Sequence, residues 1–265
     1  MKNLLTYLGI ISLTLFSFYY TNKVALMDIN DDQIMINIMK ETENDRKCSE
    51  GFITNEGVVL GYDGRKIDKE KSYNNMRISG FNKELLVFNT IPCIINKKDY
   101  IDKNIIMGNT EKNAVSFLIN VNRLNSSLKD LENHQKIRLS YIVGDKEIKK
   151  YKKDFIEGKY EIIYKGNNKK MLKEYIDITK KINITPYCIS NYVDNIKVCS
   201  KKGVNIVKAS TEINEHVFDN GKKNTKRGSF IIIEENKKNI EELNILINYT
   251  KNKGYNILSI NEHLD

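Results

Sequence analysis

Residues 228–264 carry the sequence "GSFIIIEENKKNIEELNILINYTKNKGYNILSINEHL", whose pattern predicts a strand, a helix and a second strand. The apolar run at 230–233 stops abruptly at Glu234, as an inner strand of a parallel sheet does at its carboxyl end. The next segment keeps its apolar residues on one helix face, and Gly254 is the residue type expected just after a helix C-terminus. With a short apolar strand at 255–260, the stretch predicts a βαβ unit whose crossover is right-handed by default.

Upstream of this unit the alternation of strand and helix continues. Strand patterns lie at 114–121, 136–143, 160–164, 182–187, 204–208, 229–233 and 255–260, with a helix-compatible segment in each gap. The segments 145–158 and 168–181 place apolar residues on one side and lysines on the other, as an outer layer of helices requires. Seven strands alternating with helices predict one α/β domain over residues 111–265, with a parallel sheet that is open or closed into a barrel.

Three short contexts add to this rhythm: "KKG" at 201–203, "RGSF" at 227–230 and "NKGY" at 252–255. Together they make the chain resemble the bacterial polysaccharide deacetylases of carbohydrate esterase family 4, which remove N-acetyl groups from peptidoglycan or chitin-like chains. The resemblance covers about residues 105–265. It implies an α/β fold built on an irregular seven-stranded β/α barrel.

The positions that carry catalytic groups in that family hold other residues here. The family's strand that matches 230–233 ends in Leu-His, whereas Glu234 stands in place of the histidine. The family's first strand ends in two aspartates, a base and a metal ligand, and the matching positions are Asn120 and Val121. An amide accepts no proton at neutral pH and valine cannot bind a metal, so the resemblance implies that both roles are absent.

Two further family motifs are incomplete. A His-Ser/Thr-x-x-x-His motif, which supplies two imidazoles to a metal ion, should fall at the end of the third strand, where this chain has Tyr164 and Lys165. An Arg-Pro-Pro-Tyr-Gly motif is matched by Pro186 and Tyr187, without the arginine and with Cys188 in place of the glycine. Tyr187 either lines a groove by stacking on a sugar or packs at the barrel rim.

The working residues of such a fold lie at the carboxyl ends of its strands, so the groove candidates are Asn120, Tyr164, Tyr187 and Glu234. We expect no catalytic residue, no metal site and no cofactor. The alternative is an active carbohydrate N-deacetylase with an atypical site, in which Glu234 or Glu235 acts as the base.

Histidines and cysteines give no metal-binding pattern. The histidines fall in predicted helices or helix ends, so no set of three zinc ligands is visible; they are His134, His216 and His263. The cysteines have no CxxC or Cys/His spacing; they are Cys48, Cys93, Cys188 and Cys199. Disulfides and buried free thiols both remain open for these four residues.

The first 23 residues predict export. Residues 4–22 contain no charged side chain and follow Lys2, a pattern typical of an uncleaved signal anchor, a cleaved signal peptide or, less simply, a buried helix. The pair Tyr19 and Tyr20 suits a membrane interface and favours the anchor. The expected location is the cell membrane, with a single span and an extracytoplasmic domain, or outside the cell after cleavage.

Residues 28–110 have a mixed pattern and predict a small α+β domain. We expect helices at 31–47 and 68–78, a hairpin made of 52–54 and 58–62, and a strand at 84–88; these are interpretations of caps, turns and short apolar runs. This segment resembles the N-terminal part of clostridial proteins that carry a deacetylase-like domain, which indicates no chemistry.

The net charge of the chain indicates which kinds of partner it can bind. The net charge of +9 suits anionic surfaces, including acidic wall polymers and lipid headgroups. The lysines are spread along the chain and no nucleic-acid-binding motif is present, so we expect no nucleic acid partner. The sequence therefore predicts a catalytically inactive, deacetylase-like protein outside the cytoplasm. Its expected role is to bind cell-wall glycan or to scaffold wall or sporulation machinery.

Overall fold

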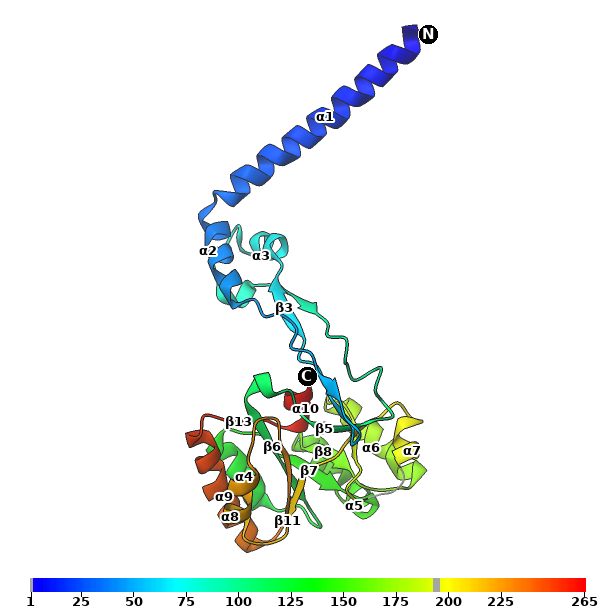
Figure 1. Ribbon diagram of the computed structural model, residues 1–265, viewed down its shortest axis with the longest axis vertical. Helices are drawn as coiled ribbons and strands as arrows, with labels where there is room; N and C mark the ends of the chain where they lie inside the picture. Colours follow the sequence, from blue (N-terminus) through cyan, green and yellow to red (C-terminus); the bar gives the residue numbers. More distant parts are fainter. Residues whose placement is uncertain (1, 193–195) are drawn as a thin grey trace. The chain divides into compact units, whose positions relative to one another are not determined.

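The computed structural model describes residues 2–192 and 196–265, and the chain divides into two compact units (Figure 1). The small unit consists of the residues up to Lys47 together with Gly64–Ile91, and the large unit consists of Cys48–Asp63 together with Pro92–Asp265. Both units are therefore built from segments that are separate in the sequence.

The small unit contains helices and a two-stranded antiparallel sheet. Its elements are α1 (Lys2–Asn30), α2 (Gln33–Glu41), η1 (Thr42–Asn44), β3 (Gly64–Ile67), α3 (Lys69–Met76), η2 (Lys83–Leu85) and β4 (Phe88–Ile91). The side chains of Asp32 and Asp68 cap the N-termini of α2 and α3. The helices expected at 31–47 and 68–78 are present with shorter bounds, whereas the residues expected to form a strand at 84–88 form η2 and only the start of β4.

Helix α1 contains the uncharged N-terminal run. Its exposed apolar side chains include Ile10, Leu13 and Phe16. Within the part of the chain that the structure describes, no helix is found that is long and apolar enough to cross a membrane. The anchor expected within residues 1–23 therefore has no support from the structure, and some of its side chains lie outside those described.

The large unit is built on a curled, mostly parallel sheet. Its strands are β1 (Phe52–Ile53), β2 (Val58–Val59), β5 (Asn104–Met107), β6 (Ala114–Asn120), β7 (Ser140–Val143), β8 (Glu161–Tyr164), β9 (Tyr187–Ile189), β10 (Asn205–Val207), β11 (Thr211–Ile213), β12 (Phe230–Glu234) and β13 (Asn256–Ile257). The strand order is β1-β2-β5-β10-β9-β8-β7-β6-β12-β11, and β13 pairs with β6. All neighbours are parallel except β1 and β2, as crossover connections through helices require.

Helices follow the strands of this sheet in turn. They are η3 (Thr110–Lys112), α4 (Ser126–Gln135), α5 (Asp145–Glu157), α6 (Lys169–Lys181), α7 (Ile196–Ser200), α8 (Val217–Asn224), α9 (Lys237–Asn252) and α10 (Ile260–Leu264). Strand β6 is buried on both faces: Phe117 and Ile119 belong to an outer apolar cluster that includes helix residues such as Leu246, and Leu118 belongs to an inner cluster. A strand covered on both sides carries a continuous apolar run, as this one does.

The C-terminal helix α10 lies at the amino ends of the strands and fills the inside of the curled sheet there. Ile260 is fully buried in the inner cluster. The backbone N–H of Ile260 donates to the hydroxyl of Ser140 at 2.9 Å, and that of Asn261 donates to the carboxylate of Glu161 at 3.0 Å. Ser140 and Glu161 are the first residues of β7 and β8. Helix α10 therefore closes the amino ends of these strands, and the polar groups there are hydrogen-bonded to it.

The predicted α/β fold with a parallel sheet is confirmed, with corrections to single strands. The strand expected at 182–187 was misplaced, because α6 runs to Lys181 and Asn183 adopts a left-handed φ of 57°, so that β9 begins only at Tyr187. Strand β11 was not predicted. It follows β10 after the short connection 208–210, which carries the chain from the side of β5 and β9 to β12. Among the described strands, β10 and β11 do not pair with each other, so the sheet is a curled half-barrel.

The pairing of β1, β2 and β5 differs from the expected division at residue 110. Val58 and Val59 are buried because β2 pairs with β5, and β5 pairs with β10 of the large sheet. A two-stranded hairpin is at best marginally stable alone. The pairing of β2 with β5 attaches the hairpin of β1 and β2 to the edge of the larger sheet. The segments 48–63 and 92–110 thus belong to the large unit, while a separately folding domain within 28–110 stays a prediction.

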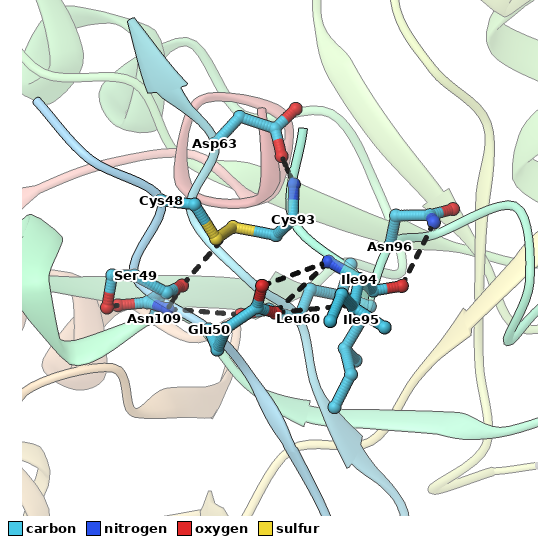
Figure 2. The surroundings of a disulfide bond; sticks show 10 residues. All are labelled: Cys48, Ser49, Glu50, Leu60, Asp63, Cys93, Ile94, Ile95, Asn96 and Asn109. Carbon is cyan, nitrogen blue, oxygen red and sulfur yellow. Dashed lines mark hydrogen bonds between the residues drawn. A yellow bond between two sulfur atoms is a disulfide. The ribbon is translucent and has the colours of Figure 1, made fainter. Parts of the chain in front are cut away.

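Both pairs of cysteines form disulfides, Cys48–Cys93 and Cys188–Cys199. Figure 2 shows the first of them between the two segments of the large unit. The Cys93 N–H donates to the carboxylate of Asp63 at 2.9 Å, and the Glu50 carboxylate accepts from the N–H of Ile94 at 3.1 Å. The disulfide and these hydrogen bonds hold Cys48–Asp63 to the chain that follows Pro92.

Candidate functional site at the carboxyl ends of the strands

Asn120 and Glu234 lie side by side because they end neighbouring parallel strands. They are paired in the register of β6 and β12. The Asn120 Nδ2 donates to Glu234 Oε1. On its other side the Asn120 Oδ1 accepts from the ammonium of Lys165, the first residue after β8, at 2.5 Å. The two predicted groove residues are thus brought together, and a lysine joins them.

Tyr192 extends this set toward β11. Its hydroxyl donates to Glu212 Oε1 at 2.9 Å and also lies 3.3 Å from Glu234 Oε1. Burial, followed by the hydrogen bond to Glu212, raises the pKa of the Tyr192 hydroxyl, which therefore stays protonated and acts as a donor. The ammonium of Lys165 lies 5.5 Å from the centre of the Tyr192 ring, within the range of a cation–π contact. We call Lys165, Asn120, Glu234, Tyr192 and Glu212 the strand-end chain.

The neighbouring residue Asn191 positions Tyr192. Its side chain accepts from the Ala209 N–H at 2.9 Å and donates to the Ala209 carbonyl at 3.1 Å. An asparagine side chain that pairs with one backbone residue in this way acts like an added strand residue. It therefore ties the end of β9 to the end of β10 and turns the chain so that Tyr192 faces Glu212.

An open hollow of about 600 Å³ lies at the same edge of the sheet, between the starts of α4 and α9. Apart from Ile240, its lining consists of amide, hydroxyl and charged side chains: Asn122, Arg123, Asn125, Ser127, Glu235, Asn236, Lys237 and Glu241. Asn125 and Asn236 cap the two helices. Donors and acceptors of both kinds in one hollow suit a ligand that carries many hydroxyl and amide groups.

Two of the predicted groove residues lie elsewhere. Tyr164 is 1% exposed, and its hydroxyl donates to the carboxylate of Asp145 while its ring stacks on Tyr175. Tyr187 is fully buried, and its N–H donates to the Tyr175 hydroxyl at 2.8 Å. Of the two expectations for Tyr187, its burial in the inner apolar cluster agrees with packing in the fold and not with lining an open groove.

The donors at the strand ends do not fit a catalytic zinc ion, which requires three protein ligands. In residues 2–192 and 196–265, the one cluster of three possible ligands is Cys48, Glu50 and Cys93, whose sulfur atoms form the disulfide. Val121 is buried in the outer apolar cluster. The histidines lie in α4, before α8 and in α10, and none of them is hydrogen-bonded to the strand-end chain in the described residues. The strand-end chain offers carboxylates, an amide, a hydroxyl and an ammonium instead.

Sequence reasoning missed Tyr192 and Glu212 as site residues. The misplaced strand at 182–187 put a strand end at Tyr187, and the undetected strand β11 hid Glu212. Lys165 was recognised only as a position without a histidine. A polar residue a few places beyond Ile189, the true end of β9, was the available signal.

Comparisons with known proteins concern the fold. No family model and no curated protein sequence matches this chain. Its structure is similar to that of BA3943 from Bacillus anthracis, a CE4 family pseudoenzyme, with a TM-score of 0.62 and 18% identity over 89% of this chain and 96% of that one. A mutant of BA3943 with restored enzymatic activity matches with a TM-score of 0.62 and 17% identity over 88% of this chain and 98% of that one. These similarities agree with the deacetylase fold that the sequence resemblance implies, but the sheet of the large unit is a curled half-barrel with more strands than the seven expected.

Proposed function

We propose that this chain, which has the fold of the polysaccharide deacetylases, binds cell-wall glycan without hydrolysing it. The strand-end chain carries this proposal. Its amide, ammonium, hydroxyl and carboxylate groups are hydrogen-bonded to one another, and they lie where a deacetylase of this fold would hold its metal and base. These groups lie at the same edge of the sheet as the open hollow that includes Glu235, and a few polar groups beside such a hollow suffice to hold a sugar weakly.

The cysteines support a location outside the cytoplasm. All four are paired in disulfides, which persist in oxidising compartments and are rare in the cytosol. The uncharged run at 4–22 is the basis for proposing retention at the membrane, or secretion if it is cleaved. Such a location would bring the strand-end chain to the wall.

Peptidoglycan fragments should bind the full-length protein with a dissociation constant from millimolar to high micromolar, roughly 4 to 6 kcal/mol. Replacing Tyr192 by alanine should weaken binding about tenfold, which corresponds to ~1.4 kcal/mol, because it removes a ring face and a hydroxyl donor. The matched control is Glu157→Gln, an exposed position at the end of α5. Isothermal titration calorimetry with defined muropeptides measures the difference, and no acetate should be released from acetylated glycan.

Other results of these binding experiments would support a different site or a different function. Equal binding by the Tyr192→Ala and Glu157→Gln variants would place the glycan away from the strand-end chain. The absence of any glycan binding would favour a scaffold for protein partners. Acetate release that disappears in Glu234→Gln would establish the alternative, an active N-deacetylase, which the half-buried carboxylate of Glu234 beside the Tyr192 hydroxyl favours.

The purified protein should hold no stoichiometric zinc, cobalt or nickel after dialysis. The physical reason is that the strand-end chain supplies two carboxylates and no imidazole, and Lys165 brings a positive charge among them. Inductively coupled plasma mass spectrometry measures the metal content. One ion per chain that is lost in the double variant Glu212→Gln/Glu234→Gln would contradict this.

A further inference from the structure

Four lysines surround one hollow on the large unit. The hollow, with a volume of about 590 Å³, lies between the start of α6 and helix α7, and is lined by Lys169, Lys197, Val198, Lys201 and Lys202. Within the part of the chain that the structure describes, no carboxylate lines it. It shares no residue with the strand-end chain.

Helix α7 and the turn that follows it place these lysines close to one another. Helix α7 has five residues, too few to be stable alone, and the disulfide from Cys199 to Cys188 of β9 holds it against the sheet. The turn that follows is closed by the Val204 N–H donating to the Cys199 carbonyl at 3.1 Å. Lys201 is the first residue after α7, and its N–H donates to the Lys197 carbonyl at 3.3 Å, so the two side chains keep the four-residue spacing at which like charges repel. The fold therefore maintains a repulsive arrangement that a bound anion would relieve.

The ammonium groups have no counter-charge among the described ion pairs, none of which includes the lysines of this hollow. By contrast, Lys152 on the neighbouring helix α5 pairs with Glu174. Several positive charges in one hollow favour a compact ligand with more than one negative charge, and a phosphate group carries about −1.5 to −2 near neutral pH. The hollow has no arginine, whose planar fork suits a carboxylate, whereas lysine binds phosphate as a point charge.

We propose that this four-lysine hollow binds a compact phosphate group with more than one negative charge, as found in pyrophosphate or in the phosphate monoester headgroup of a lipid. The proposal is independent of glycan binding at the strand-end chain. It assigns a function to a set of charges that contributes nothing to the barrel core.

The test compares two triple variants of the full-length protein. The first, Lys169→Gln/Lys197→Gln/Lys201→Gln, removes three charges from the hollow. The control, Lys146→Gln/Lys149→Gln/Lys153→Gln, removes the same number from exposed positions of α5. Calorimetry with pyrophosphate at low salt should show binding to the wild type and the control, and at least a tenfold loss of affinity in the first variant. Thermal unfolding checks that all three proteins are folded.

The outcomes separate the sources of the phosphate and the failure of the proposal. Binding to phosphatidic acid vesicles that is lost in the first variant alone would identify a lipid headgroup, and pyrophosphate binding without vesicle binding would identify a soluble phosphate. No pyrophosphate binding by the wild type, or an equal loss in both variants, would overturn the proposal. Equal binding of duplex DNA by all three proteins would show general attraction between charges. If pyrophosphate also bound equally to all three, the proposal would be overturned.

Discussion

Replacing Cys48 and Cys93 together by serine should lower the free energy of unfolding of the large unit by about 4 kcal/mol. The bond closes a sequence separation of 45 residues, and loop-closure entropy in the unfolded chain grows with that length. The bond also holds in place the hydrogen bond of Asp63 to the Cys93 N–H (Figure 2). Urea unfolding followed by circular dichroism measures the change.

The second disulfide supplies the matched control. Cys188–Cys199 closes a separation of 11 residues, for which the same chain-entropy relation gives about 3 kcal/mol. We therefore expect the double serine variant at 188 and 199 to lose less stability than the one at 48 and 93. A loss below about 1 kcal/mol for the Cys48–Cys93 variant would show that the remaining hydrogen bonds keep the two segments together without it.

Acid should destabilise the protein through His263. This side chain is 1% exposed; burial, and then the nearby Lys112, lowers the pKa of its imidazole from 6.5 to about 3. The Nδ1 lies 2.8 Å from the Ser116 hydroxyl, and the buried Nε2 has no hydrogen-bond partner among the described residues. A Cβ added at Gly108 would lie 2.2 Å from that Nε2, so the ring has no room beside it.

A histidine whose folded pKa is lowered binds a proton more readily in the unfolded chain. Its contribution is therefore complete above pH 6.5 and is lost as the pH falls toward 3, by about 2 to 3 kcal/mol between pH 6.5 and 4.5. Buried Glu161, whose pKa burial raises, acts in the opposite direction, so the variant comparison isolates the histidine. The free energy of unfolding of His263→Asn should change less with pH than that of the wild type. The free energy of unfolding of His216→Asn, at an exposed position, should change with pH as the wild type does. Parallel profiles for His263→Asn and the wild type would contradict the assignment.

The amino-acid sequence determined the elements whose signals are local. The run from Phe230 to Glu234 is a buried parallel strand, α9 follows it, and Gly254 ends that helix with a φ of +80°. Helices α5 and α6 agree with the predicted segments 145–158 and 168–181 because apolar periodicity and caps act over a few residues. The identities of Asn120 and Glu234, where the resemblance implies an aspartate and a histidine, could also be read from the sequence alone.

Only the tertiary structure decided which side chains meet. The sheet orders β6 beside β12 and carries β11 across to β12, and this arrangement brings Lys165, Tyr192 and Glu212 to Asn120 and Glu234. It also placed Tyr187 in the core and not in an open groove, because β9 spans 187–189 instead of the predicted 182–187 and Tyr187 therefore begins the strand. The disulfide partners and the four-lysine hollow likewise depend on which residues, far apart in the chain, come close together in the fold. No local sequence pattern predicts these distances.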